Sequence, residues 1–267
     1  MSQETQAVDV LVIGTGASGM ATAVTAAAQG LQVLVVDKQP QFGGTTARSG
    51  GWLWIPGTHL AKEQGIEEPP GAAKAYLKHE ATTHYDERRV DAFLENGPKA
   101  IEFFTSQTPL RFDLPPVFPD YHAEAPGGLP GGRSMVTRPY DGRELGPRIK
   151  LLAPPLPELT VFGMMLGSGP EIRHFMRVFK SPTSFWYVTK RLTRHFFDVL
   201  FHGRGMTLTN GNALAGRLAK AAMERNIPVW LSSPVKQLLV EGGAVTGALV
   251  EHEGRPVRVL ARRGVVL

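Results

Sequence analysis

The stretch VDVLVIGTGASGMATAVTAAAQGLQVLVVDKQPQFGGTTARSGG, residues 8–51, decides the fold of this chain. Its apolar, β-branched start at 8–13 is typical of a buried strand. The strand leads directly into GTGASG at 14–19, which is the G-x-G-x-x-G pattern of dinucleotide-binding turns. The alanine-rich segment 17–29 predicts the helix that follows, and Gly30 ends that helix.

Each position of this motif has a predicted role in binding a dinucleotide. Gly14 permits the tight turn, Gly16 leaves room for a pyrophosphate against the backbone, and Gly19 lets the helix pack closely on the strand. The N-terminal N–H groups of the helix, beginning at Ala17 and Ser18, face the phosphates.

A second predicted strand at 31–36 ends at Asp37, followed by Lys38. Asp37 stands at roughly the 20-residue spacing of the acid that hydrogen-bonds a ribose hydroxyl in dinucleotide-binding folds. We therefore assign Asp37 and its neighbour Lys38 to the cofactor site. A glycine-rich turn in another kind of parallel α/β protein is the alternative, and it leaves Asp37 unexplained.

A second glycine-rich loop, FGGTTARSGG at 42–51, determines which dinucleotide is expected. A nicotinamide cofactor needs no such loop after the acid, whereas FAD has to be held along its pyrophosphate, ribityl chain and ring. Backbone amides and small hydroxyl side chains at close approach suit that task. The loop residues assigned to FAD binding are Gly43, Gly44, Thr45, Thr46, Ser49, Gly50 and Gly51.

With these two loops the chain resembles the flavoprotein family that includes fumarate reductase and 3-ketosteroid Δ1-dehydrogenase, in which a GGTS-like loop follows the ribose acid. The next residues, WLWIPG at 52–57, resemble the ketosteroid dehydrogenase branch. The resemblance implies removal of a hydride from C1 and a proton from C2 of a 3-ketosteroid, with an external electron acceptor. No histidine stands in or next to 45–51, where covalent-flavin members carry one, so the FAD is expected to be non-covalent.

A proline- and glycine-rich segment at 109–132 predicts a long loop, which follows predicted helices at 72–85 and 86–107. The loop contains FPDYH at 118–122, an element that the ketosteroid dehydrogenases share in similar form. The resemblance implies that Tyr121 lies beside the flavin and assists the catalytic base. Residue chemistry alone favours a tyrosine that packs over the loop with its hydroxyl in solvent. Arg133 is expected to hold the loop by hydrogen bonds, because an apolar ketone offers it no anion.

The last quarter of the chain predicts a helix at 211–225, a strand at 227–231 and a β-meander at 235–240, 244–251 and 256–261. The resemblance implies that the backbone of Val235 meets the adenine. A further apolar strand is expected at 263–267, and we interpret the chain as the N-terminal portion of a longer protein. The catalytic base and the ketone-polarising groups are then expected beyond Leu267, so that this fragment is inactive alone.

The predicted fold is therefore an α/β, Rossmann-like FAD-binding domain spanning 1–267, with a parallel sheet, helices and a β-meander. A loop-rich and helical insertion is expected at about 109–204, and the catalytic domain is expected to be absent from this chain.

The segment SFWYVTKRLTRHFFDVLF at 184–201 combines aromatic and basic residues. A helix with Ser184 as its N-cap places one apolar stripe along its length, comprising Phe185, Val188, Leu192, Phe196 and Val199. Such a stripe is typical of a core helix. It also fits an interfacial helix that contacts a membrane and admits a lipophilic substrate.

Composition excludes several classes of function. The chain contains no cysteine, which excludes disulfides, thiolate catalysis and cysteine-ligated metal within it, and no metal site is predicted. The formal charge of +5 is scattered, so nucleic-acid binding is not expected. The N-terminus lacks the layout of a secretory signal, and no apolar run reaches membrane-spanning length. The expected location is the cytoplasm, with peripheral membrane contact through 184–201 as the alternative interpretation.

Three functions follow from these observations. The leading one is the FAD-binding part of a 3-ketosteroid Δ1-dehydrogenase-like enzyme with a small apolar, steroid-like substrate. The first alternative is a fumarate reductase-like or other enoate reductase of the same fold. The second is a truncated, non-catalytic nucleotide-binding module.

Overall fold

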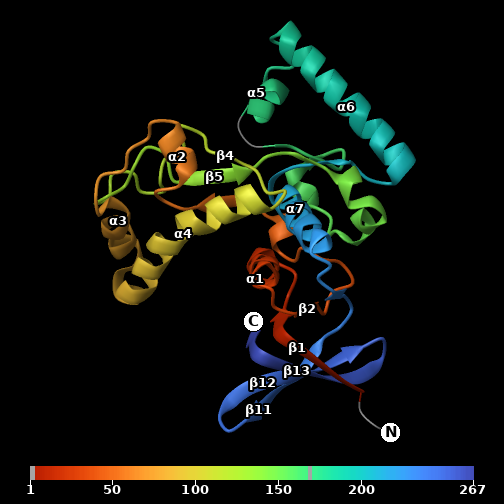
Figure 1. Cartoon of the computed structure of the whole chain (residues 1–267). Helices are drawn as coiled ribbons and strands as arrows, with labels where there is room; N and C mark the ends of the chain where they lie inside the picture. The colour runs from red at the N-terminus through yellow and green to blue at the C-terminus, as the bar shows by residue number, and fades with distance from the viewer. Residues whose placement is uncertain (1–3, 168–169) are drawn as a thin grey trace. The chain divides into compact units, whose positions relative to one another are not determined.

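The computed structural model describes residues 4–167 and 170–267 of the chain (Figure 1). These residues form two compact units, one comprising Met1–Gly51 and Pro139–Leu267 and the other Trp52–Arg138. The predicted insertion at about 109–204 extends over parts of both units. Its bounds, and the absence of a catalytic domain, stay predictions.

The first unit is built on a six-stranded sheet with the order β10-β2-β1-β13-β12-β11. Strands β10, β2, β1 and β13 run parallel to one another, and β12 runs antiparallel to both β13 and β11. The parallel half with its helices and the antiparallel meander confirm the predicted α/β fold class. The bounds are β1 Glu4–Ile13, β2 Val33–Val36, β10 Val229–Trp230, β11 Val235–Glu241, β12 Ala244–His252 and β13 Arg255–Val266.

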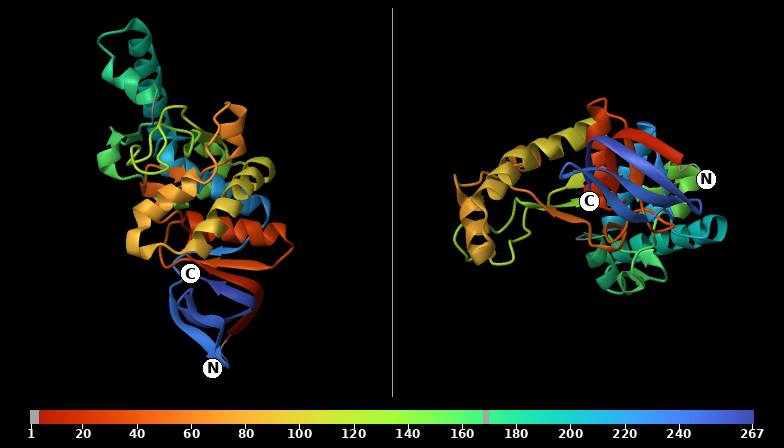
Figure 2. Two further views of the ribbon diagram at one scale, coloured as in Figure 1. Left: turned by 90° about the vertical axis from the view of Figure 1, so that its left-hand side faces the viewer. Right: turned by 90° about the horizontal axis from the view of Figure 1, so that it is seen from below.

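Two alanine-rich helices, α1 Ala17–Ala28 and α7 Asn210–Glu224, contact each other, and α1 also contacts β1 and β2. All four residues of β2 are buried, as expected for a parallel strand covered on both faces. Small side chains such as the buried Ala23 let the helix lie close to the sheet. The meander continues the sheet away from these helices (Figure 2).

The prediction of a separate strand at 263–267 is wrong. Strand β13 continues without a break to Val266, because its second half pairs in parallel with β1 while its first half also pairs with β12. A register shift between Val8 and Val10 on β1 absorbs the irregularity.

Helix α6, Pro182–His202, also differs from prediction. It begins after Ser181, with Pro182 in the first turn, whereas Ser184 lies inside the helix. The predicted apolar stripe is not the buried face, since Phe196 is 64% exposed. Polar contacts orient the helix instead: Asp198 accepts a hydrogen bond from the Met206 amide at 3.0 Å, and the buried His195 contacts the Phe162 carbonyl at 2.9 Å.

The other elements of this unit are short. The segment Gly142–Leu151 (η3) is 3₁₀-helical on both sides of a kink at Gly146. The remaining bounds are η1 Thr46–Arg48, β6 Tyr140–Asp141, η4 Pro157–Leu159, β7 Thr160–Val161, β8 Met164–Met165, α5 Pro170–Met176 and β9 Thr207–Leu208. Among the helices that the structure describes, none combines the length and apolarity needed to cross a bilayer.

The second unit contains a three-stranded sheet, β3-β5-β4, and three helices. The two helices predicted here are confirmed, and Asp86 caps the longer one by accepting hydrogen bonds from Arg88 N and Arg89 N. Residues 114–133 form no helix or strand, as the proline content predicts. The bounds are β3 Trp52–Trp54, α2 His59–Glu63, α3 Ala72–Ala81, η2 Thr82–His84, α4 Glu87–Gln107, β4 Phe112–Asp113 and β5 Ser134–Thr137.

Candidate cofactor site

The turn between β1 and α1 has the geometry that its glycines require. Gly14 adopts φ = 108°, a conformation disfavoured for other residues, and its amide donates to the Val36 carbonyl at 2.7 Å. A Cβ atom on Gly19 would lie 2.1 Å from the Gly14 carbonyl oxygen. A side chain at Gly19 would therefore collide with the turn, so helix α1 can start at this position only with glycine there.

The two glycine-rich loops meet at the start of α1. The Ala17 amide donates to the Thr46 hydroxyl at 2.9 Å, and a Cβ atom on Gly44 would lie 3.8 Å from the Gly16 Cα atom. Gly16 itself has space for a Cβ, whose nearest neighbour would be Thr46 Oγ1 at 3.7 Å. Two backbones without side chains thus face each other beside a helix N-terminus, a position suited to a pyrophosphate.

Asp37, at the end of β2, is held by the first loop. Its carboxylate accepts hydrogen bonds from the Thr15 amide, at 2.8 Å, and from the Thr15 hydroxyl. Its other oxygen accepts from the Gln39 amide at 2.9 Å. The Thr15 hydroxyl also accepts from the Gly43 amide at 3.1 Å. Thr15 therefore joins the predicted ribose acid to the second loop, a role that sequence reasoning missed.

The second loop is packed against the N-terminus of α7. Gly43 has φ = 105°, and a Cβ there would be 3.2 Å from that of Ala215. A Cβ on Gly211 would lie 1.9 Å from the Thr46 carbonyl oxygen, and the Gly211 amide donates to the Ser49 carbonyl at 3.1 Å. Gly51, with φ = 68°, is similarly close to Asn210. These contacts fix the course of the loop from both ends.

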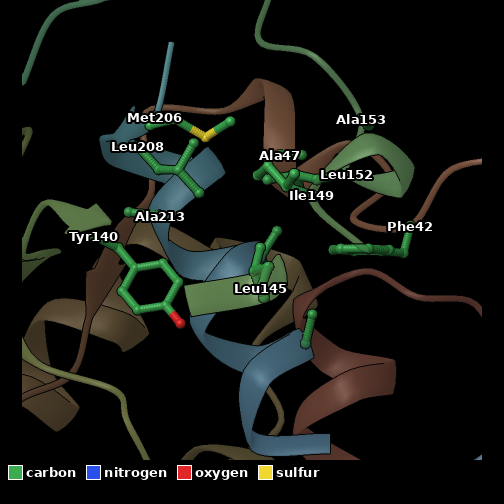
Figure 3. Close-up of a cluster of buried hydrophobic side chains, with 12 residues drawn as sticks. Phe42, Ala47, Tyr140, Leu145, Ile149, Leu152, Ala153, Met206, Leu208 and Ala213 are labelled. Atoms are coloured by element: carbon green, nitrogen blue, oxygen red, sulfur yellow. The ribbon is translucent and has the colours of Figure 1, made fainter. Parts of the chain in front are cut away.

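Buried apolar side chains pack against the second glycine-rich loop (Figure 3). Phe42 precedes the loop and Ala47 lies within it, and both belong to one buried cluster with Leu145, Leu152 and others. Tyr140 is also a member, and burial raises the pKa of its phenol above the usual value. Tyr140 is therefore a packing residue and not a candidate base.

A polar clasp completes the support of the loop. Asn212, buried in α7, donates its side-chain N–H groups to the carbonyls of Ala47 at 3.0 Å and Ala153 at 2.9 Å. Arg204 donates to Asn212 Oδ1 at 3.0 Å and to the Leu152 carbonyl at 2.8 Å. Sequence reasoning missed this clasp, because Asn212 and Ala47 are 165 positions apart.

The other predicted cofactor residues lie around the same sheet end or in the same loop. The Ser233 amide donates to the Asp37 carbonyl at 2.7 Å, which places Val235, the first residue of β11, two positions from this contact. Lys38 and Gly50 are exposed. Their roles in binding, like those of the remaining predicted residues, stay predictions.

Tyr121 lies in the second unit on a well-braced loop. The preceding residue, Asp120, accepts hydrogen bonds from Trp54 Nε1 at 2.7 Å and Arg133 Nη1 at 2.6 Å. Arg133 is buried and also donates to Glu68 at 2.6 Å, which confirms its predicted role in holding the loop. The Tyr121 side chain is 98% exposed, so its hydroxyl has solvent around it. Its predicted catalytic role stays a prediction.

A cavity of about 380 Å³ lies beside the clasp in the first unit. Its lining includes Arg204, Asn212, His195 and Met165. None of the residues predicted to bind the cofactor is among those that line it.

A parallel sheet whose first turn faces a second glycine-rich loop defines a dinucleotide-binding protein of the flavoprotein type. A family model described as FAD binding domain matches residues 9–267. The chain belongs to this FAD-binding domain family, which indicates FAD as its cofactor.

Two relatives of known activity match nearly the whole chain. A 4-oxocyclohex-2-ene-1-carboxylate 5-dehydrogenase from Sinomonas cyclohexanicum is 42% identical, over 99% of this chain and 44% of that protein. A 3-oxosteroid 1-dehydrogenase from Mycobacterium tuberculosis is 35% identical, over 98% of this chain and 47% of that protein. The chain thus spans about half the length of the curated relatives it matches.

A solved structure matches as well. The crystal structure of 3-ketosteroid delta1-dehydrogenase from Sterolibacterium denitrificans, in complex with 1,4-androstadiene-3,17-dione, aligns with a TM-score of 0.85 at 34% identity. The alignment covers 97% of this chain and 47% of that one. The match therefore extends through both units of this chain.

Proposed function

We propose that this chain is the FAD-binding part of a dehydrogenase that introduces a double bond beside the ketone of an apolar ring, with a 3-ketosteroid as substrate. The observation that carries the proposal is the meeting of the two glycine-rich loops at Ala17 and Thr46, with Gly16 and Gly44 face to face. The names and the 34–35% identity of two steroid dehydrogenases support the choice of substrate.

The reaction removes one hydride and one proton from adjacent ring carbons, and bound FAD supplies the hydride acceptor. The residues of this chain bind and orient. Gly16 and Gly44 leave room for a pyrophosphate, and Asp37 retains accepting capacity for a ribose hydroxyl. Tyr121 is proposed to assist a base that lies outside this chain. An external acceptor is proposed to reoxidise the flavin.

Non-covalent attachment of the FAD is part of this proposal. It is supported by the absence of histidine from 45–51 in the sequence. Acid precipitation of the purified, yellow protein is expected to release all of its flavin into the supernatant. Flavin that stays with the pellet would contradict non-covalent binding.

Titration of the apo-chain with FAD and with NAD tests the cofactor assignment directly. We expect saturable quenching of FAD fluorescence at micromolar concentration or below, and no saturable binding of NAD over that range. Preference for NAD would overturn the assignment. A folded chain that binds neither compound would also overturn the assignment.

A second candidate substrate is a small oxo-cyclohexene carboxylate. It is favoured by the 42% identity to a dehydrogenase with that substrate in its name, which exceeds the 35% identity to the steroid enzyme. The intact protein, assayed with an artificial acceptor on both substrate types, separates the candidates by kcat/KM. The 267-residue chain alone is proposed to be inactive on both, and turnover by it would refute that part.

We further propose peripheral contact with a membrane through residues 184–201. Support comes from the aromatic side chains of α6 that face solvent, among them Trp186 at 69% exposure. An apolar ketone partitions into lipid, so contact with a bilayer brings the enzyme to its substrate. The cytoplasmic location stays a prediction.

A further inference from the structure

Helices α5 and α6 carry an apolar surface that no described part of the chain covers. The large side chains involved are exposed, with Phe179 at 94% and Phe201 at 72%. They lie on the two helices and, for Phe179, on the turn between them, and the helices contact each other (Figure 1). We call this surface the α5–α6 face and define it by Met176, Phe179, Trp186, Phe197, Leu200 and Phe201.

The opposite side of α6 already provides the contacts that hold the helix. Ser184, Val188, His195 and Asp198 are its buried residues. At 100° per residue, Trp186, Phe197 and Leu200 point roughly away from Ser184, as their exposure also shows. The aromatic residues of the α5–α6 face are therefore not needed to dock α6 on its own unit. Exposed apolar patches of this kind mark interaction surfaces.

The exposed charges carried by the two helices and their linker are positive. Between residues 171 and 204 the sequence contains two carboxylates, Glu171 and Asp198, and both are buried. The exposed Lys and Arg side chains of the two helices and their linker are Arg173, Arg177, Lys180, Lys190 and Arg194. Arg194 also contacts the carboxylate of Asp141, on β6, at 3.4 Å. A second copy of the same face would place these cations against one another, which opposes self-association. An anionic surface would be attracted by them.

We propose that the α5–α6 face docks on an anionic lipid bilayer, with its aromatic side chains inserted at the headgroup boundary and its cations over lipid phosphates. The docking rests on the proposed function only for its biological role, which is to give the enzyme access to an apolar ketone dissolved in lipid. The bilayer is then one of negative charge, and its contact extends from 184–201 to Met176 and Phe179. Aromatic rings flanked by Lys and Arg are the composition that binds at such boundaries.

Co-sedimentation with vesicles tests the proposal on the 267-residue chain without substrate. We expect the chain to pellet with vesicles of equimolar phosphatidylcholine and phosphatidylglycerol, to pellet weakly with phosphatidylcholine alone, and to be released by high salt. Trp186 emission is expected to shift to shorter wavelength on binding, and Trp186→Phe is expected to remove most of that shift.

Two pairs of variants distinguish binding through this face from non-specific binding to vesicles. Each Lys or Arg near an anionic bilayer contributes roughly five-fold to affinity, so Lys190→Glu with Arg194→Glu is expected to weaken binding at least about 25-fold. The matched control, Lys62→Glu with Arg255→Glu, changes net charge equally at exposed positions elsewhere and is expected to lose much less. Phe197→Ser with Phe201→Ser is expected to abolish binding, whereas Val117→Ser with Val240→Ser, also exposed, is not.

Three outcomes would overturn the proposal: no binding to anionic vesicles, equal losses in the test and control variants, or a concentration-dependent dimer that Phe197→Ser with Phe201→Ser dissolves. The last would assign the face to a second copy. Melting temperatures identify any variant that fails to fold, and because every substituted side chain is exposed we expect all to fold. FAD titration of the same samples reports on the proposed function separately from lipid binding.

Discussion

The carboxylate of Asp37 accepts both the backbone N–H and the hydroxyl of Thr15, a residue 22 positions earlier in the chain. The same hydroxyl accepts the Gly43 amide at 3.1 Å, so one side chain joins the end of β2 to both glycine-rich loops. Thr15 is 2% exposed and has no room to exchange these partners for water. One buried hydroxyl therefore links the ribose acid directly to the flavin loop.

Replacing Thr15 with valine is expected to weaken FAD binding and to lower stability. Valine retains the shape of threonine but leaves the Gly43 amide without this acceptor and removes one donor from Asp37. An unsatisfied buried group costs about 1–3 kcal/mol, so the free energy of unfolding should fall by that amount. Denaturant unfolding and FAD titration measure the two effects. Thr15→Ser keeps the hydroxyl and is the control, and an equal loss of FAD affinity in both variants would contradict the hydroxyl's role.

Gly16→Ala and Gly19→Ala are expected to separate cofactor binding from folding. At Gly16 a Cβ makes only an ordinary contact, at 3.7 Å from Thr46 Oγ1, but it projects where the loops face each other. FAD affinity should fall roughly tenfold or more, about 1.4 kcal/mol, with little change in melting temperature. At Gly19 the Cβ would lie 2.1 Å from a carbonyl oxygen, and the forced shift should destabilise the fold by about 1–3 kcal/mol. Melting curves with and without FAD distinguish the two patterns, and unchanged FAD affinity in a folded Gly16→Ala protein would argue against a pyrophosphate there.

The sequence predicts features that follow from local backbone requirements. It does not predict contacts between side chains that are far apart in the chain. Gly14 and Gly43 were predictable because glycine is the residue that adopts positive φ with the least strain. Thr15 was not, because the x positions of G-x-G-x-x-G carry no fixed residue type. Asn212 was not either, since its partner Ala47 becomes a neighbour only after α7 has packed on the loop. The orientation of α6 was mispredicted because hydrophobic periodicity ignores polar anchors such as Asp198.

Removing the Asn212 side chain is expected to weaken the attachment of the flavin loop to α7. Asn212→Ala leaves the Ala47 and Ala153 carbonyls without their donors and Arg204 without one acceptor, all in a buried setting. We expect a loss of about 2–4 kcal/mol in the free energy of unfolding, and weaker FAD binding at temperatures where the protein is still folded. Asn96→Ala is the matched control, because Asn96 is exposed on α4 and bonds only the carbonyl of Ala92 one turn earlier. That change should stay within about 0.5 kcal/mol. If the two variants lost equal stability, the clasp would have no special role.

The loop that carries Tyr121 is expected to be held by a pH-dependent contact. The next residue, His122, places its Nδ1 2.9 Å from Glu80 on α3, and this hydrogen bond raises the pKa of the imidazole while lowering the pKa of the Glu80 carboxyl. A raised histidine pKa stabilises the folded state fully below the unfolded value near 6.5, and the gain is lost as pH rises through the folded value. The lowered pKa of Glu80 stabilises the folded state above the ordinary pKa of 4.5, and this stabilisation is lost as pH falls through the folded value. The contact is therefore strongest between these limits.

Other charged groups also face this pair: His79 contacts Glu80 at 3.3 Å, and Glu124 adds a weaker attraction to His122. NMR titration of His122 should show its pKa falling in Glu80→Gln and changing less in Glu124→Gln, and a value unmoved by Glu80→Gln would show that the contact is not formed in solution.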